Sequence, residues 1–192
     1  MKKAFVISIS SPSGGGKTTV VSALVAQLAN CAAIHWDDYG DEVGLNRDIN
    51  EWAADGFDCS EWNVEPVVAD IEKMLKEPYE YIILDYPFGY LNECVGKYID
   101  LSVFIDTPLD VALARRIIRD CAIHSNGLEF INSELHQYLE YSRLTYVKML
   151  EMLKPTSDLV VDGTKTPDEI AEVVFEAVMS KKGKDETNHG IS

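Results

Sequence analysis

A glycine-rich segment constrains the fold of this chain more than any other feature: residues 11–19, with the sequence SPSGGGKTT. An apolar run typical of a buried strand precedes it at residues 4–9, and apolar residues recur at helical spacing from Val20 to Leu28. In such a turn, successive backbone N–H groups converge on one concavity and bind phosphate oxygens, and the following helix adds its positive N-terminal end. The segment therefore predicts a phosphate-binding loop between a strand and a helix.

The side chains of this loop also match phosphate chemistry. Lys17 would reach the terminal phosphates of a nucleotide, and the Thr18 hydroxyl would ligate Mg²⁺. The full pattern, G-x-x-x-x-G-K-[ST], places a glycine at position 11, where this chain has Ser11. If that position requires a positive φ, serine adopts it less readily than glycine. The residues expected to contact the phosphates of ATP are Ser13, Gly14, Gly15, Gly16, Lys17, Thr18 and Thr19.

The composition narrows the classes of partner. The chain has 192 residues, of which 46% are hydrophobic and 26% charged, as in a soluble globular domain. Its 17 Lys and Arg against 32 Asp and Glu give a net charge of −15, which disfavours nucleic acids and anionic membranes as partners because both are bound through positive surface. The four cysteines form no C-x-x-C pair, and no signal-peptide pattern or membrane-length apolar run is present, so we expect a cytoplasmic protein. A homo-oligomer is left open.

Strand-like and helix-like segments alternate along the chain. This alternation predicts an α/β fold with a doubly wound, mainly five-stranded parallel sheet and helices on both faces. Short apolar runs place the strands at 4–9, 31–36, 80–85, 101–105 and 158–162. Helices are expected from Pro66, from Thr107-Pro108, from Thr166-Pro167 and over about 132–153.

We expect one domain over residues 1–180. Residues 38–63 show no periodicity and form a long acceptor-side loop, of a length that is usually functional. A helical lid is expected over about 115–131. The nearly apolar-free segment 181–192 is expected to be a disordered tail.

Carboxylates follow two of the predicted strands. Ligands of such sheets bind at the carboxyl ends of the strands, so acids at these positions lie near the phosphate loop. Asp37 is the candidate base that takes a proton from an attacking hydroxyl, whereas its neighbour Asp38 faces away, caps a turn or contacts the substrate. Asp85 ends the third strand and is expected to complete the Mg²⁺ site with Thr18. Solvated surface acids are the alternative interpretation.

Three arginines fall within five positions on the helix that follows the fourth strand: Arg115, Arg116 and Arg119. Guanidinium groups suit a transferring phosphoryl group, so the cluster predicts a phosphate clamp. Arg115 and Arg119 share a helix face and join Lys17 as catalytic cations, with Arg116 as an ATP ligand. An exposed face paired with nearby acids is the alternative.

Weaker signals complete the expected site. Tyr39, Trp62 and Tyr86, with Asp38, are candidate substrate contacts, although packing alone also explains aromatic residues. Gly163 and Thr164 follow the last strand and are expected against the base of the nucleotide.

These motifs together resemble the uridine kinase and nicotinamide riboside kinase group of P-loop kinases. The most specific similarity is the segment from Asp106-Thr107-Pro108 to Asp120. The segment around Ile34–Tyr39 resembles the one that carries the acceptor-side aspartate of these kinases, which Asp37 matches. The resemblance implies a P-loop nucleoside triphosphate hydrolase fold and transfer of the ATP γ-phosphate, with Mg²⁺, to a hydroxyl of a nucleoside or riboside. Asp85 stands where several members carry glutamate.

Two other functions stay open. A nucleoside monophosphate kinase of the adenylate kinase type needs cations on the acceptor side, and Arg47 is the one Lys or Arg within 38–63. That composition favours a neutral or cationic acceptor. A protein that binds ATP without catalysing transfer is the second alternative.

Overall fold

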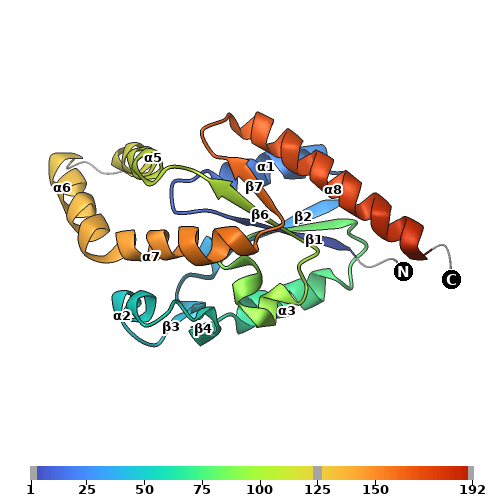
Figure 1. Cartoon of the computed structure of the whole chain (residues 1–192), viewed down its shortest axis with the longest axis horizontal. Coiled ribbons are helices and arrows are strands. Elements are labelled where there is room, and N and C mark those ends of the chain that lie inside the picture. The colour runs from blue at the N-terminus through green and yellow to red at the C-terminus, as the bar shows by residue number, and fades with distance from the viewer. Residues whose placement is uncertain (1–3, 123–126, 190–192) are drawn as a thin grey trace.

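Five parallel strands form the central sheet of this chain. The structure is a computed structural model that describes residues 4–122 and 127–189. The strands lie in the order β2-β5-β1-β6-β7, so the chain winds outward in both directions from β1 (Figure 1). Each predicted strand is confirmed to within one residue at either end. Their bounds are β1 Phe5–Ser10, β2 Cys31–His35, β5 Tyr81–Asp85, β6 Leu101–Asp106 and β7 Leu159–Asp162.

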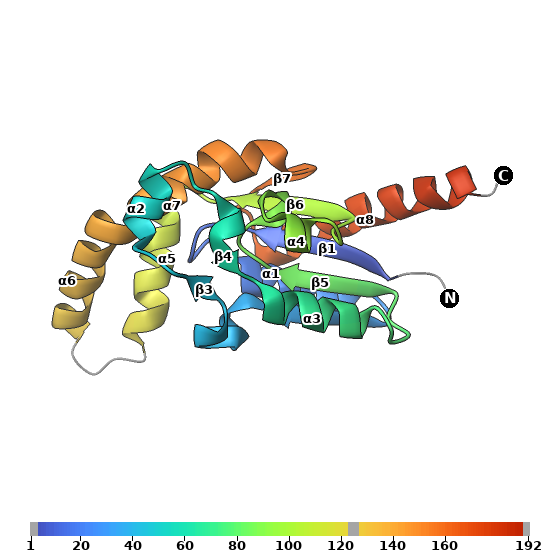
Figure 2. The same cartoon turned by 90° about the horizontal axis from the view of Figure 1, so that it is seen from below.

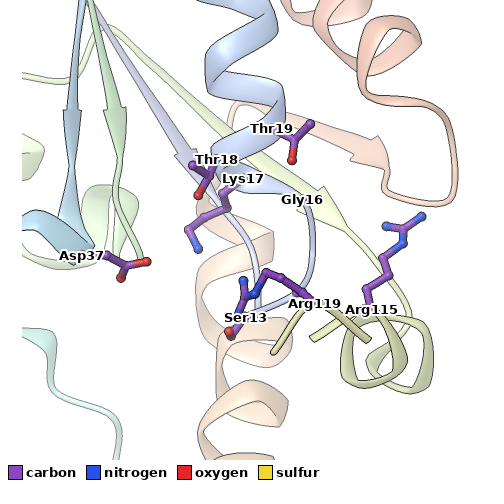
Figure 3. Close-up of a pocket in the computed structure, with 9 residues that line it drawn as sticks. Ser13, Gly16, Lys17, Thr18, Thr19, Asp37, Arg115 and Arg119 are labelled. Atoms are coloured by element: carbon purple, nitrogen blue, oxygen red, sulfur yellow. The ribbon is translucent and has the colours of Figure 1, made fainter. Parts of the chain in front are cut away.

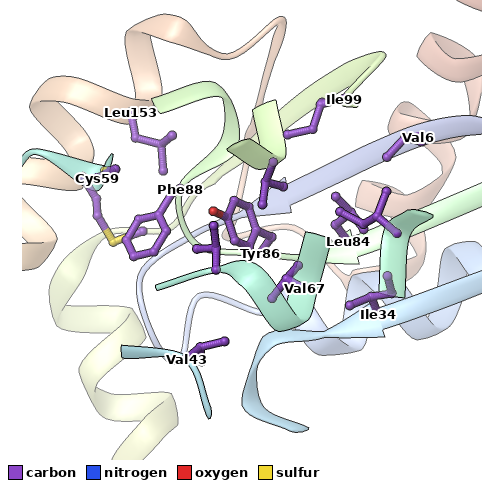
Figure 4. Close-up of a cluster of buried hydrophobic side chains, with 14 of the residues drawn as sticks. Val6, Ile34, Val43, Cys59, Val67, Leu84, Tyr86, Phe88, Ile99 and Leu153 are labelled. Carbon is purple, nitrogen blue, oxygen red and sulfur yellow. The ribbon is translucent and has the colours of Figure 1, made fainter. Parts of the chain in front are cut away.

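Helices cover both faces of the sheet, which explains why the strands are apolar without clean alternation. α1 (Lys17–Gln27) and α8 (Pro167–His189) pack together on one face, where Ile7 and Ile9 of β1 meet buried Leu24 of α1. On the other face, α3 (Glu65–Met74) and α4 (Glu93–Gly96) enclose a second core with Val6 and Leu84 (Figure 4). The fold is the doubly wound α/β architecture that the sequence predicts.

A pair of helices projects beyond the carboxyl ends of the strands (Figure 2). α5 spans Leu109–Cys121, and α6 spans Gly127–Gln137 beside it. Helix continues from α6 through a π-helical turn at Tyr138–Ser142, α7 at Arg143–Lys148 and a second π-helical turn at Met149–Leu153, and a 3₁₀ turn follows at Lys154–Thr156. We call residues 127–153 the helical arm. It begins five residues before the predicted start at 132, and residues 123–126 of the expected lid lie outside the described part of the chain.

The expected loop at 38–63 is folded into short elements. They are a 3₁₀ segment at Trp36–Glu42, β3 at Gly44–Leu45, α2 at Ile49–Ala54, a 3₁₀ turn at Cys59–Glu61 and β4 at Trp62–Asn63, with β3 and β4 antiparallel. A further 3₁₀ turn at Gly89–Leu91 follows β5. Asp48 caps α2 by accepting hydrogen bonds from two backbone N–H groups, and Trp52 is fully buried. Caps and buried aromatics hold residues 36–63 together, although their sequence has no periodicity. We call this segment the acceptor lobe, after the role expected for residues 38–63.

The sequence predicts helices that begin at Thr107 and at Thr166, and only Thr166 caps its helix in the structure. Thr166 and Glu169 form the reciprocal capping pair at the start of α8. Thr107 does not cap α5, which begins at Leu109; its hydroxyl donates instead to the Gly15 carbonyl oxygen at 2.9 Å. This threonine therefore anchors the phosphate-binding loop.

The C-terminal helix is longer than expected. α8 continues to His189, so residues 181–189 are helical rather than disordered, and 190–192 lie outside the described part. Lys181 pairs with Asp158 at 3.2 Å, and Lys182 lies 3.9 Å from the Tyr81 ring centroid. These contacts tie a polar helix end to the sheet. No helix among residues 4–122 and 127–189 has the length and apolarity to cross a membrane.

The helical arm offers a direct test of which side chains hold the fold. Leu153 is fully buried in the acceptor-side core, whereas Leu139 on the same arm is 68% exposed. We expect Leu153→Ala to lower the free energy of unfolding by about 2–5 kcal/mol, since it leaves a cavity. The matched change Leu139→Ala should cost less than about 0.5 kcal/mol. Urea denaturation of the three proteins measures both, and equal losses would contradict this assignment of the core.

Candidate active site

The loop between β1 and α1 has the backbone of a phosphate-binding loop. Gly14 and Gly16 have φ of 81° and 101°, values that glycine adopts without strain. The Gly15 N–H donates to the Pro12 carbonyl oxygen at 2.9 Å, which closes the turn. The N-terminal end of α1 follows directly at Lys17. The geometry therefore provides the convergent N–H groups and helix end that bind phosphate oxygens.

Ser11 fits this loop without backbone strain. Its φ is not positive, so the position does not require the freedom of glycine. Its side chain instead fills space inside the turn, where the hydroxyl donates to the Pro12 carbonyl oxygen at 3.0 Å. A Cβ at Gly15 would lie 2.5 Å from that hydroxyl oxygen. Serine at 11 and glycine at 15 are thus sterically matched.

A cavity of about 260 Å³ opens in front of the loop (Figure 3). It brings together residues from three distant parts of the chain: the phosphate-binding loop, the end of β2 and α5. Asp37 and Lys17 extend into it from opposite sides in this view. The lining residues are Ser13, Gly14, Gly16, Lys17, Thr18, Thr19, Asp37, Arg115 and Arg119.

Asp85, at the end of β5, contacts two residues that line the cavity. The Thr18 hydroxyl donates to its carboxylate at 2.6 Å, and the Lys17 ammonium lies 3.7 Å away. The side chain is only 6% exposed. Among the described residues no group of three or more His, Cys, Asp and Glu could hold a metal ion. Thr18 and Asp85 nevertheless fit Mg²⁺, which is often bound through one carboxylate together with nucleotide phosphates and water.

His35 is a member of this site that the sequence patterns did not reveal. Its Nδ1 lies 3.4 Å from the Asp85 carboxylate, because β2 and β5 pair in register with His35 opposite Asp85. A histidine near the end of one predicted strand and an aspartate at the end of another were the available signal. The sequence pattern alone could not predict the register between two strands that are far apart in the chain.

The three arginines of α5 have different surroundings. Arg115 and Arg119 line the cavity, and Arg115 also donates to the Gly163 carbonyl oxygen at 2.9 Å. The hydrogen bond to Asp120 and, to a smaller extent, the charge of Asp37 raise the pKa of Arg119. Arg116 is not among the lining residues. Its guanidinium pairs with Glu134 of α6 at 2.5 Å.

Asp38 and Tyr39 lie in a second cavity of about 390 Å³, beside β2 and α3. The Tyr39 hydroxyl donates to Asp70 at 2.9 Å, and burial together with this bond raises the pKa of the phenol. Glu42 adds a further acid to the lining. The adjacent carboxylates Asp37 and Asp38 therefore face different cavities.

Trp62 and Tyr86 belong to an aromatic cluster behind Asp37. Trp36, which directly precedes Asp37, has its ring centroid 5.9 Å from that of Trp62 and 5.5 Å from those of Tyr86 and Phe88. Tyr86 is 1% exposed, and burial raises the pKa of its hydroxyl. Trp36 and Trp62 are half-buried, so these two residues, rather than Tyr86, keep exposed surface.

The loop after β7 packs closely against Thr107, the residue that also binds the phosphate-binding loop. A Cβ at Gly163 would lie 1.9 Å from the Thr107 hydroxyl oxygen, so glycine permits this close approach. The Thr164 N–H and hydroxyl both bind Asp162. Neither Gly163 nor Thr164 lines the cavity in front of the loop.

Sequence comparison identifies related proteins. A model of the "Phosphoribulokinase / Uridine kinase family" matches residues 57–169, more than half of the chain. This range begins after the phosphate-binding loop, so the match and the loop geometry are independent indications. Proteins named uridine kinase from Borrelia hermsii and Borreliella burgdorferi are each 28% identical, over 94% and 96% of this chain and 98% and 100% of theirs.

Comparison with solved structures identifies similar folds. The chain resembles TT1252 from Thermus thermophilus with a TM-score of 0.53 and 17% identity, over 94% of this chain and 98% of the other. It resembles an uncharacterized protein from Eubacterium ventriosum with a TM-score of 0.54 and 15% identity, over 93% and 99%. At these identities the likeness shows a common fold alone.

The packing of the loop against α5 generates a test. A Cβ at Gly14 would lie 2.1 Å from the Ala112 carbonyl oxygen, and its φ is positive. We expect Gly14→Ala to displace the loop and weaken ATP binding by at least about 10-fold, or about 1.4 kcal/mol. Gly127→Ala is the control, since a Cβ added there would meet nothing within 4 Å. Calorimetric titration with ATP measures both, and unchanged binding by Gly14→Ala would contradict the loop geometry.

Proposed function

This chain belongs to the phosphoribulokinase / uridine kinase family, and we propose that it transfers the γ-phosphate of ATP to a hydroxyl group of a nucleoside. One observation carries the proposal: the cavity that holds the phosphate-binding loop and two arginines also holds the carboxylate of Asp37. Phosphoryl transfer needs positive charge around the phosphates and an acceptor for the proton of the attacking hydroxyl. This cavity supplies both.

Each residue then has a stated role. The N–H groups of residues 13–19 and the Lys17 ammonium bind the phosphates of ATP, while Arg115 and Arg119 neutralise charge on the transferring group. Thr18 and Asp85 would hold Mg²⁺, which supplies further positive charge when bound. Asp37 accepts the proton as the acceptor oxygen bonds to the γ-phosphorus and the bond to the leaving ADP oxygen breaks. The proton thus passes to the carboxylate.

The charge of the acceptor lobe supports a neutral acceptor over a nucleoside monophosphate. Arg47 is the single Lys or Arg in residues 38–63, and both arms of its guanidinium are occupied, by Asp55 and Glu61 at 2.7 Å each. No other cation of that segment is available for an acceptor phosphate. A phosphate brought among these acids would meet like charge at close range.

The aromatic residues of the acceptor lobe support a planar acceptor. Trp36 directly precedes Asp37 and packs edge-on against Trp62, and both side chains are half-buried, so a base could stack on their exposed surface while its ribose hydroxyl approaches the carboxylate. The relatives named uridine kinase favour a pyrimidine nucleoside within this class.

The four cysteines are all unpaired, which fits the reducing cytoplasm as the proposed compartment. Asp38 and Tyr39, which line the second cavity, are kept as candidate substrate contacts, whereas the burial of Tyr86 disfavours such a role. A homo-oligomer is left open.

An acceptor panel tests the reaction. With Mg-ATP, we expect ADP formation with uridine, cytidine or a related riboside, and none above background with the corresponding monophosphates. Coupled ADP detection measures this, and mass spectrometry identifies the phosphorylated product. Turnover of a monophosphate would support the adenylate kinase-type alternative, and ATP binding without any turnover would support a non-catalytic protein.

A substitution tests the role of Asp37. Asp37→Asn should bind ATP with unchanged affinity but lower kcat by about 10²–10⁴-fold, because the amide cannot take the proton. Asp41→Asn removes the same charge from an exposed position of the same segment and should leave kcat within about 2-fold. Steady-state kinetics with calorimetric ATP binding separate the effects. A kcat for Asp37→Asn equal to that of the unchanged protein would remove Asp37 from this role.

A further inference from the structure

Arg116 differs from the two arginines beside it in what it contacts. Its side chain is only 10% exposed, and it lies between the helical arm and the phosphate-binding loop. One guanidinium nitrogen contacts the Glu134 carboxylate at 2.5 Å, and the other lies 3.3 Å from the Tyr146 hydroxyl. Both partners belong to the arm, and Arg116, unlike Arg115 and Arg119, is not among the residues that line the cavity.

The same turn of α5 packs directly on the phosphate-binding loop. A Cβ at Gly14 would lie 2.1 Å from the Ala112 carbonyl oxygen and 3.2 Å from the Arg116 Cβ. One turn of α5 is therefore enclosed by the loop on one side and by the arm on the other. The direction in which Arg115 and Arg119 project depends on both contacts.

We propose that Arg116 is a positioning residue, which fixes α5 between loop and arm so that its neighbours face the phosphates, and that it does not bind phosphate itself. This inference rests on the proposed kinase function. A guanidinium that turned toward ATP would leave the Glu134 carboxylate, 19% exposed, without its cation. Leaving one member of a largely buried ion pair unpaired is strongly unfavourable. Its two terminal nitrogens already contact two different side chains of the arm, which the several donors of a guanidinium allow in a fixed geometry and a Lys ammonium does not.

The arm extends this positioning to the acceptor lobe. The Asn50 side-chain amide of α2 donates to the Glu140 carbonyl oxygen at 3.1 Å, within the first π-helical turn. π-helical turns inside α-helices are frequent at functional sites, because they alter the backbone hydrogen-bonding pattern. An unbroken series of contacts thus joins the acceptor lobe, the arm, Arg116 and the phosphate-binding loop. The structure assigns Arg116 the central place in that series.

Substitution of the partner distinguishes positioning from phosphate binding. Glu134 lies outside the cavity and is negatively charged. If Arg116 were a phosphate ligand, removal of Glu134 would free its guanidinium and would leave ATP binding unchanged or make it tighter. If Arg116 positions α5, Glu134→Ala should weaken ATP binding by about 10-fold, Arg116→Met should do the same, and the double variant should lose no more than the worse single variant. Calorimetric titration of the full chain with ATP measures all three. Unchanged or tighter binding by Glu134→Ala would overturn the proposal, and so would a double variant whose loss equals the sum of the two single losses.

A control variant and hydrogen exchange test the positioning role of Arg116 separately from the kinase function. Glu140→Ala removes an exposed carboxylate from the same arm while keeping the backbone carbonyl that Asn50 uses, and it should leave ATP affinity unchanged. Hydrogen exchange without nucleotide should show at least about 10-fold faster exchange at residues 109–121 in Glu134→Ala and no change in Glu140→Ala. Equal exchange in the two variants would overturn the positioning role. Absence of ATP binding by the unchanged protein would instead refute the kinase function, and the exchange result would still decide the role of Arg116.

Discussion

The hydrogen bond from Thr18 to Asp85 joins the two halves of the nucleotide site. It ties the first turn of α1 to the end of a fully buried strand, at 2.6 Å and with the carboxylate almost excluded from water. A buried carboxylate is costly unless it is paired or hydrogen-bonded, so Asp85 needs its loop partners Thr18 and Lys17 as much as the loop needs Asp85. His35 contributes a third contact from the neighbouring strand. Because every parallel strand presents its carboxyl end at this edge, the remaining site residues are delivered to the same place.

The acidic character of the chain makes the distribution of its few cations informative about the proposed substrates. With a net charge of −15, the protein attracts an anionic nucleotide only where its cations are concentrated, and Lys17, Arg115 and Arg119 meet in one cavity. On the acceptor side, Arg47 is neutralised by two acids. In the proposed reaction, the two substrates would therefore meet surfaces of opposite charge. That contrast supports binding of phosphates at the donor position and of an uncharged acceptor beside Asp37.

Much of the fold was predictable from sequence, because its signals are local. The glycines of residues 14–16, the apolar strand runs and the Thr166–Glu169 cap each act within a few positions, and the structure contains all of them. The cavity likewise unites Asp37 with the predicted loop and two predicted arginines. Local patterns could not place Thr107 or Arg116, whose partners Gly15 and Glu134 lie 92 and 18 residues away. The folding of residues 38–63 depends in the same way on the burial of Trp52, which periodicity does not reveal.

The contact of Thr107 with two other loops restricts how this protein can change over evolutionary time. Its hydroxyl binds the Gly15 carbonyl oxygen and at the same time leaves no room for a side chain at Gly163. Three segments from separate parts of the chain are therefore interlocked through a single hydroxyl group. A substitution in one of them is tolerated only if the other two accommodate it, whereas the acceptor lobe is held by its own caps and aromatic packing. During evolution, we expect the three segments around Gly15, Thr107 and Gly163 to be preserved together. Changes in acceptor preference should arise by substitutions within the acceptor lobe.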